Sequence, residues 1–332
     1  MKKILLIKLG DIGDVIRTIP IAKAIKDKYL CKLFWLTSQD AKEIIENQEF
    51  IDEVITSPPS LEDTFDILIN LDINLEALKL SSKLKSSEKF GFYDDSGYPS
   101  AFTLDAEYFL NTFFNNDLKK TNEKTYQEMM FLASELPFTR EKYFLKINEK
   151  SEIFAEYFSR RNYLHSNKLI GISLNYSNDK PSASWHNKNI LKFIKLAKKE
   201  GYEILLLGRP EDSEKYNDLK QLIAKESITV YKNDFQDSFQ NFMAIINLCK
   251  YIITGDSISL HISLGLNKKT IGLFFVTSPK EIEGYGLLKK LKSPNLDEFF
   301  PEKTSQYNEE LAKSISSEEV LKSIHEFEKE ND

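Results

Sequence analysis

The fold is decided by the stretch Lys3-Ile4-Leu5-Leu6-Ile7-Lys8-Leu9-Gly10-Asp11-Ile12-Gly13-Asp14-Val15-Ile16. Residues 4–8 form a compact aliphatic run typical of a buried strand, and the two glycines that follow mark a turn. From Val15 to Lys28 apolar residues recur at helical spacing, so we expect a helix there, kinked at Pro20. A strand, a tight turn and a helix in this order predict the first unit of a parallel, doubly wound sheet.

The same alternation of strand and helix continues along the chain. Further strands are expected at residues 33–36, 53–55, 66–71, 169–174, 203–207, 228–231, 251–254 and 270–275. Helices are expected at residues 39–47, 74–84, 151–163, 187–200, 213–225, 238–249, 257–264 and 316–330, and residues 102–137 are expected to be largely helical. We therefore predict an α/β protein with two Rossmann-like domains, residues 1–155 and 156–315, followed by a final helix at 316–332.

Composition excludes several classes of protein. The 332 residues suffice for two domains, and a hydrophobic share of 41% rules out wholesale disorder. A net charge of -6 argues against a sequence-independent nucleic-acid binder, which needs a broad basic field. The first apolar run breaks at Lys8, too early for a signal peptide, and no stretch approaches the roughly 20 apolar residues of a membrane span. We expect a soluble, cytoplasmic protein.

Neither a disulfide framework nor a metal site is expected. Cys31 and Cys249 lie far apart in apolar stretches, which favours two small buried side chains. The four histidines lack the spacing of metal ligands. We therefore expect no metal and no cofactor.

The loop at residues 10–14 carries two carboxylates. The carboxylates of Asp11 and Asp14 would repel a phosphate bound at this loop. The G-x-G-x-x-G fingerprint is absent, which disfavours a dinucleotide-dependent oxidoreductase. The loop suits the binding of an acceptor substrate, from whose hydroxyl Asp14 could take a proton. The alternative is that Asp14 caps the helix and that the glycines serve a turn with positive φ.

The loop at residues 255–261 follows a strand of the second half and begins a short helix. Ser257 and the free N–H groups of the first helical turn can form an anion site without a lysine. Asp256 could orient a neighbouring group or accept sugar hydroxyls, and His261, one turn further on, could reach the same ligand. The alternative for His261 is a histidine of the core.

Two further loops follow strands of the second half. Residues 175–185 are polar, and Ser177 and Lys180 could help to surround a diphosphate; equally, this could be a surface loop that ends at a packed tryptophan. Gly208 and Glu211 follow the next strand, the usual place for a carboxylate that binds ribose hydroxyls.

Together these motifs resemble the ADP-heptose:lipopolysaccharide heptosyltransferase family, the ninth family of glycosyltransferases. Residues 3–20 resemble the family's first strand, its Gly-Asp turn and its Thr-x-Pro, and residues 255–261 resemble its Asp-Ser/Thr-Gly-x-x-His run. Three positions depart from the pattern. Ile258 stands where the family has glycine, Ala183 where it has lysine, and Lys89 where it has arginine.

The resemblance implies a GT-B fold, with two domains facing each other across a cleft and a last helix that returns to the N-terminal domain. It implies a metal-independent, inverting glycosyltransferase that moves a sugar, heptose, from a nucleotide-diphospho-sugar such as ADP-heptose to a lipopolysaccharide core or another lipid-linked or oligosaccharide acceptor. Carried over by position, Asp14 is the general base. The expected donor-binding residues are Ser177, Lys180, Gly208, Glu211, Asp256, Ser257, Ile258 and His261, and the expected acceptor-binding residues are Asp11, Gly13, Arg17 and Lys89.

The departures leave a second hypothesis open, namely a sugar-nucleotide-binding protein that has lost the transfer reaction. A set of basic residues could meet an anionic acceptor or lipid headgroups, although each is equally an ordinary solvated lysine. These residues are Lys83, Lys85, Lys89, Lys119 and Lys120. An acceptor in the cell envelope would place the protein peripherally at the inner face of the cytoplasmic membrane.

Overall fold

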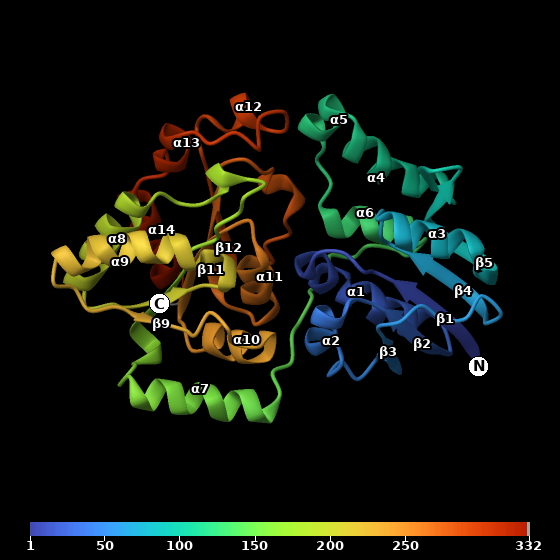
Figure 1. The fold of residues 1–332 in the computed structure, drawn as a ribbon, viewed down its shortest axis with the longest axis horizontal. Coiled ribbons are helices and arrows are strands. Elements are labelled where there is room, and N and C mark those ends of the chain that lie inside the picture. The colour runs from blue at the N-terminus through green and yellow to red at the C-terminus, as the bar shows by residue number, and fades with distance from the viewer. Residues whose placement is uncertain (331–332) are drawn as a thin grey trace. The chain divides into compact units, whose positions relative to one another are not determined.

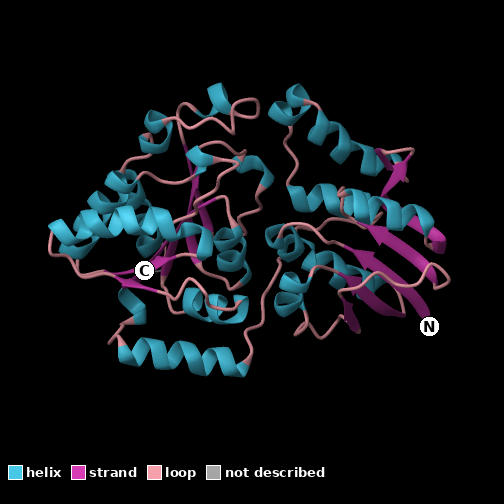
Figure 2. Ribbon diagram, viewed as in Figure 1, coloured by secondary structure: helices cyan, strands magenta, loops and turns pink. Residues whose placement is uncertain are grey.

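A computed structural model describes residues 1–330 of the protein. The chain divides into an N-terminal unit, Met1–Lys146 with Lys280–Glu283, and a C-terminal unit, Ile147–Pro279 with the chain from Gly284 onward. Each unit is built on one six-stranded sheet with flanking helices (Figures 1 and 2). The predicted boundary at residue 155 falls inside helix α7 (Glu149–Arg161), which belongs to the C-terminal unit.

The sheet of the N-terminal unit has the order β3-β2-β1-β4-β5-β6. Its strands are β1 (Lys2–Ile7), β2 (Cys31–Leu36), β3 (Glu53–Ile55), β4 (Thr64–Asn70), β5 (Lys85–Asp95) and β6 (Tyr98–Ala101). Its helices are α1 (Ile12–Lys28), α2 (Gln39–Ile45), α3 (Leu75–Lys83), α4 (Leu104–Phe114), α5 (Asn116–Thr121) and α6 (Tyr126–Ala133). Strands β1 to β5 pair in parallel and β6 is antiparallel to β5. Strands β5 and β6 were not predicted, because polar and charged residues interrupt their apolar positions.

The sheet of the C-terminal unit is parallel throughout, in the order β12-β11-β10-β7-β8-β9. Its strands are β7 (Leu169–Ser173), β8 (Glu203–Leu207), β9 (Tyr231–Lys232), β10 (Tyr251–Gly255), β11 (Lys269–Phe274) and β12 (Leu288–Lys292). Besides α7, its helices are α8 (Asn187–Lys199), α9 (Ser213–Lys225), α10 (Phe239–Asn247), α11 (Ile258–Gly265), α12 (Leu296–Phe299), α13 (Glu309–Lys313) and α14 (Ser317–Lys329). Strand β9 overlaps the predicted strand 228–231 only at Tyr231, and the lysine-rich β12 was not predicted.

Strand β1 shows why the sequence predicted a parallel sheet. The side chains of Ile4, Leu5, Leu6 and Ile7 are all 0% exposed, so both faces of the strand are buried. A strand buried on both faces reads as a continuous apolar run, and such strands are typical of parallel sheets covered by helices.

Each sheet has one topological switch point. The chain runs from β1 outward to β3 and then returns to β4 beside β1; in the second sheet it runs from β7 outward to β9 and returns to β10 beside β7. Open α/β sheets bind ligands outside the carboxyl ends of their strands at such points. The loops after β1 and β4, and those after β7 and β10, are therefore where a site is expected.

The final helix forms as predicted. Helix α14 begins with a capping box in which Ser316 and Glu319 exchange hydrogen bonds. The apolar side chains of Val320, Ile324 and Phe327 belong to the core of the C-terminal unit, where α14 packs on α8 and β11. Within its own unit this face completes the core, and the expected return of the last helix to the N-terminal domain stays a prediction.

The two cysteines are buried and unpaired, as predicted. Burial raises the pKa of the Cys249 thiol to about 12, so this thiol is inert at neutral pH. Within residues 1–330, no group of three or more histidine, cysteine or acidic side chains could hold a metal ion. In the same residues, no helix combines the length and the apolar character needed to cross a membrane.

Candidate functional site

The loop after β1 places Asp14 inside a helix rather than at its cap. Helix α1 has Asp11 in the N-cap position, and Asp14 is the third residue of its first turn. The interpretation of Asp14 as the N-cap is therefore wrong. Neither Gly10 nor Gly13 has a positive φ, so the turn does not explain these glycines either. Asp11 is exposed and its side chain makes no capping hydrogen bond.

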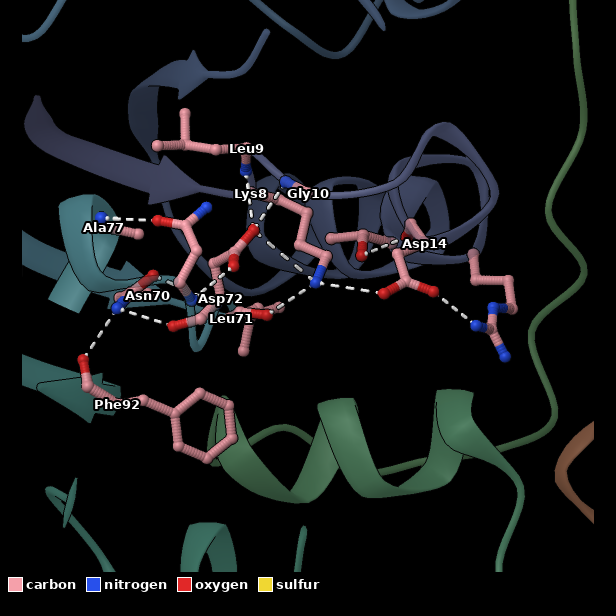
Figure 3. A network of polar contacts seen from close by, with 12 residues as sticks. Lys8, Leu9, Gly10, Asp14, Asn70, Leu71, Asp72, Ala77 and Phe92 are labelled. Atoms are coloured by element: carbon pink, nitrogen blue, oxygen red, sulfur yellow. Dashed lines mark hydrogen bonds and ion pairs between the residues drawn. The ribbon is translucent and has the colours of Figure 1, made fainter. Parts of the chain in front are cut away.

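Asp72, which the sequence analysis missed, organises this loop. It follows β4 and is 4% exposed. Its Oδ2 accepts hydrogen bonds from the backbone N–H of Leu9 at 2.9 Å and of Gly10 at 2.6 Å, while its Oδ1 accepts one from Asn74 at 2.9 Å. A Cβ on Gly10 would lie 3.0 Å from Asp72 Oδ2. Gly10 is thus explained by the close approach of a carboxylate that joins the loops after β1 and β4 (Figure 3).

Asn70, the last residue of β4, holds Asp72 in turn. Its Oδ1 accepts from the N–H of Asp72 at 3.0 Å, and its Nδ2 donates to the carbonyl of Phe92 on β5 at 2.8 Å. Gly91 has φ +82°, and a Cβ there would lie 1.9 Å from the carbonyl oxygen of Asn70. Strand β5 therefore supports the site through its backbone.

Lys89 on β5 is used for structure. Its ammonium donates to the carbonyls of Ser81 at 2.7 Å and Ser82 at 3.2 Å, at the end of α3. Burial lowers the pKa of this lysine. Among the expected acceptor-binding residues, Lys89 has no described contact with the groups around Asp14.

Lys8 is a buried cation at the centre of the site. Its Nζ donates to the carbonyl of Leu71 at 3.0 Å and lies 3.4 Å from Asp14 Oδ2 and 3.7 Å from Asp72 Oδ2 (Figure 3). Burial by itself lowers the pKa of Lys8, but the neighbouring carboxylates of Asp14 and Asp72 act against burial, and the pKa lies above its usual value. Lys8 therefore carries its charge at every physiological pH.

Arg17 supplies a second cation to Asp14. It lies one helical turn after Asp14, donates from Nη2 to Asp14 Oδ1, and places its guanidinium 3.8 Å from the centre of the Tyr126 ring. Burial raises the pKa of the Tyr126 hydroxyl, which keeps that ring neutral. Each oxygen of Asp14 thus faces a cation, which stabilises the ionised carboxylate, and its side chain is 26% exposed. Such a carboxylate can accept a proton from a hydroxyl that reaches it.

The loop after β10 has a different chemistry. Ser257 occupies the N-cap position of α11 but makes no capping bond; its hydroxyl lies 2.9 Å from Thr254 Oγ1. His261 is 3% exposed, and its Nε2 lies 3.8 Å from Asp256 Oδ1. His261 is therefore a buried histidine that also faces a predicted site residue. Ile258, the first residue of α11, is half-buried.

The loop after β7 packs closely on the loop after β10. Ser173 Oγ donates to Ser259 Oγ at 3.0 Å. A Cβ on Gly255 would lie 2.3 Å from Asn175 Nδ2 and 2.9 Å from the carbonyl oxygen of Ala183. The absence of a side chain at Gly255 therefore lets the two loops meet at the switch point of this sheet.

A second unpredicted carboxylate, Asp212, joins the loops after β7 and β8. It is 4% exposed, and it accepts hydrogen bonds from the backbone N–H of Tyr176 at 2.7 Å and of Arg209 at 2.9 Å. Burial raises the pKa of Asp212, and these two bonds oppose the rise. The loops that it joins carry four of the expected donor-binding residues. These are Ser177, Lys180, Gly208 and Glu211.

The four residues differ in their surroundings. Lys180 and Glu211 are exposed, and the hydroxyl of Ser177 accepts from the N–H of Lys180 at 3.2 Å. Gly208 is explained by packing, because a Cβ there would lie 2.6 Å from the ring of Phe235. The tryptophan that ends the loop, Trp185, is buried and donates to the carbonyl of Ile315 at 2.9 Å.

The fold defines a two-domain α/β protein in which each doubly wound sheet carries polar loops at its switch point. Residues 60–308 match glycosyltransferase family 9 (heptosyltransferase), and the chain belongs to this family. The matched residues do not include the loop of Asp11 and Asp14, so the interpretation of that loop depends on its geometry and on the resemblance of its motif.

Known proteins agree with this assignment. Lipopolysaccharide heptosyltransferase 2 of Escherichia coli (strain K12) is 26% identical over 100 residues, which cover 30% of this chain and 29% of that protein. The match thus spans less than a third of that relative's length. A glycosyl transferase family 9 structure from Veillonella parvula DSM 2008 covers 98% of this chain and 96% of its own, with a TM-score of 0.76 and 19% identity.

The structure of E. coli ADP-heptose lps heptosyltransferase II covers 98% of both chains, with a TM-score of 0.72 and 16% identity. At these identities the likeness concerns the fold, which is of the GT-B type, as predicted.

Proposed function

We propose that the protein is a glycosyltransferase that moves heptose from ADP-heptose or a similar nucleotide-diphospho-sugar to a glycan acceptor. Family membership supports the reaction class, and the structural neighbour described as an ADP-heptose heptosyltransferase supports the donor. The observation that carries the proposal is the geometry of Asp14. Its carboxylate is accessible and lies between Lys8 and Arg17, and it is not the helix cap.

In the proposed reaction, Asp14 accepts the proton of the acceptor hydroxyl. The acceptor oxygen forms a bond to the anomeric carbon of the sugar, and the bond from that carbon to the diphosphate oxygen breaks, leaving its electrons on the diphosphate. Attack on the face opposite the leaving group inverts the configuration. Lys8 and Arg17 keep Asp14 ionised and oriented until the proton is transferred. Asp11 and Gly13 lie beside Asp14 on the acceptor side.

The donor would bind to the loops of the C-terminal unit. The N-terminal end of α11, with Ser257, suits a diphosphate because the first backbone N–H groups and the helix dipole favour an anion there. Lys180 is an exposed cation on a neighbouring loop, and Glu211 an exposed carboxylate for hydroxyl groups. These groups support a reaction that does not depend on a metal ion.

A lipid-linked acceptor, such as a lipopolysaccharide core, would bring the protein to the inner face of the cytoplasmic membrane. Helices α4 and α5 support this part of the proposal. Phe113, Phe114 and Leu118 are 44%, 61% and 45% exposed, beside Lys119 and Lys120. Exposed aromatic residues next to lysines suit a peripheral contact with anionic headgroups.

The test is ADP release by the purified protein when it is given ADP-heptose and a core-lipid acceptor. We expect Asp14→Asn to lower the rate by about 10²- to 10⁴-fold, because the neutral amide cannot accept the proton. Asp27→Asn is the matched control, since Asp27 is an exposed carboxylate on the same helix, paired with Lys23 at 2.6 Å. Presenting the acceptor in anionic vesicles and in detergent micelles tests the membrane contact in the same assay.

Two results would contradict the proposal. If the wild type binds ADP-heptose but releases no ADP, the protein is instead a sugar-nucleotide-binding protein without transferase activity. If Asp14→Asn retains the wild-type rate, Asp14 is not the base.

A further inference from the structure

Lys215 ties together the two ends of the 175–185 loop. Its Nζ donates to the carbonyl of Leu174 at 2.9 Å, to the carbonyl of Trp185 at 2.7 Å, and to the hydroxyl of Ser184. Leu174 directly follows β7, and Trp185 lies just before α8. An ammonium has three N–H donors, so the charged side chain satisfies all three acceptors.

The position of Lys215 within its helix is electrostatically unfavourable for a charged lysine. It is the third residue of α9, in the first turn, where the helix dipole disfavours a cation. Asp212, which joins the loops after β7 and β8, occupies the N-cap position of the same helix. Asp212 and Lys215, at the beginning of α9, thus hold the loops that carry the expected donor-binding residues.

Lys215 also lines a pocket of about 260 Å³ in the C-terminal unit. The other titratable residues that line the pocket are Glu214 and Asp218 of α9, His186 at the cap of α8, Tyr176 and Tyr307. Asp212, at the cap of α9, acts on Lys215 through its charge. Burial lowers the pKa of Lys215 to about 7, and Asp212 opposes the fall. A neutral amine has only two N–H donors, so deprotonation removes one of the three hydrogen bonds that join Lys215 to the loop, while Ser184 Oγ still donates to the carbonyl of Leu174 at 2.7 Å.

We propose that Lys215 is a positioning residue for the donor nucleotide: in its charged form it holds the 175–185 loop in the conformation that presents Ser177 and Lys180. This inference rests on the proposed function only in taking a nucleotide as the ligand of that loop. Because the charged form binds the nucleotide better, affinity falls as the pH rises through 7, and binding near that pH takes up a proton.

The first experiment measures ADP binding by calorimetry at pH 6 and pH 8.5, in buffers of different ionisation enthalpy. Variants are compared at the same pH because ADP itself titrates. We expect Lys215→Met to bind about tenfold more weakly at pH 6, as the loss of charge-assisted hydrogen bonds implies, and to lose the proton uptake. Lys215→Arg keeps a permanent charge and should lose the pH dependence. Lys220→Met, an exposed lysine of the same helix, should behave like the wild type.

The second experiment needs no nucleotide. Trp185 fluorescence is followed against pH in a Trp35→Phe background, so that one tryptophan reports. We expect a transition near pH 7 that Lys215→Met abolishes. His186 adjoins this tryptophan, but burial lowers its pKa below the ordinary value of 6.5, so its titration lies at lower pH.

The outcomes separate the two proposals. Wild-type affinity and pH dependence in Lys215→Met, or a fluorescence profile that this variant leaves unchanged, would overturn the positioning role. If the fluorescence transition depends on Lys215 but the protein binds neither ADP nor ADP-heptose, the contact of Lys215 with the 175–185 loop is supported. The same result would count against the proposed function. If circular dichroism shows Lys215→Met to be unfolded, Lys215→Arg decides through its pH profile.

Discussion

The two switch points of the molecule share a topology and differ in their chemistry. Beside β1 and β4 the loops are joined by charges, with Lys8 between the carboxylates of Asp14 and Asp72. Beside β7 and β10 the loops meet through hydroxyl groups and close packing, as at Ser173 and Ser259. The same βα arrangement can therefore fix an ionised carboxylate between cations at one point and hold a helix N-terminus beside hydroxyl groups at the other.

The largest expected difference between the two points is in stability. Asp72→Ala leaves Lys8 buried with one counter-charge fewer and removes the acceptor of three backbone N–H groups, so we expect a loss of about 3–5 kcal/mol. Ser257→Ala removes one hydroxyl contact from a half-buried residue and should cost about 1 kcal/mol. Urea unfolding of both variants measures this.

Asp66→Ala is the control for the Asp72 variant. Asp66 is an exposed carboxylate on β4 that accepts one backbone N–H, from Lys3 at 2.6 Å. Its loss should resemble that of Ser257→Ala. Equal losses for Asp72→Ala and Ser257→Ala would show that the charged network is not what holds the first loop.

The glycines sharpen the comparison. Gly255→Ala meets the carbonyl oxygen of Ala183 at 2.9 Å and Asn175 Nδ2 at 2.3 Å, and a backbone atom cannot swing away. Gly10→Ala meets only the side-chain carboxylate of Asp72, at 3.0 Å. We expect overpacking to cost about 1–3 kcal/mol, with Gly255→Ala the more destabilised in thermal unfolding. The reverse order would indicate that the Asp72 carboxylate is held more rigidly than the backbone of the second loop.

A difference in pH dependence separates the half-buried Lys215 from the buried Lys8. The ordinary pKa of 10.5 falls to about 7 for Lys215 in the folded protein, so between these values the unfolded chain carries the extra proton and stability rises with pH. The free-energy difference between wild type and Lys215→Met should rise between pH 7 and 9, by at most about 1.4 kcal/mol per unit.

Lys8 is the matched case with the opposite sign. Its pKa is raised, so its contribution is fully present below 10.5 and is lost only at higher pH. The difference between wild type and Lys8→Met, measured in urea over pH 6–9, should therefore be flat. A slope for Lys8→Met in this range would mean that its charge is not held by Asp14 and Asp72.

The parts of the fold that could be predicted are those whose burial shows as a local pattern of apolar residues in the sequence. Strands β1, β7 and β10 lie inside parallel sheets and contain continuous apolar runs, so their ends were predicted to within two residues. Strand β12 lies at a sheet edge and reads Leu-Lys-Lys-Leu-Lys, which shows no such run. Edge strands commonly carry lysines, and this composition hides them from a pattern of hydrophobicity.

The candidate site was predicted where a short motif carries it. Asp14 and Ser257 follow strands at the switch points, Asp14 in the first turn of α1 and Ser257 at the N-cap of α11. Asp72 follows the strand β4 in the same way, so the same signal could have found it. Lys215 offered no signal, because its three acceptors lie between 30 and 41 residues away in the sequence.

By itself the sequence determined the alternation of strands and helices, the two sheets and the loops that end them, because apolar periodicity and turn residues act locally. Only the tertiary structure decided which charges meet. Lys8 and Asp72 are 64 positions apart and become partners because β1 and β4 are neighbours, a pairing fixed by the core and not by either residue. It also decided that α14 completes the C-terminal core, since an amphipathic helix requires an apolar partner but does not specify which one.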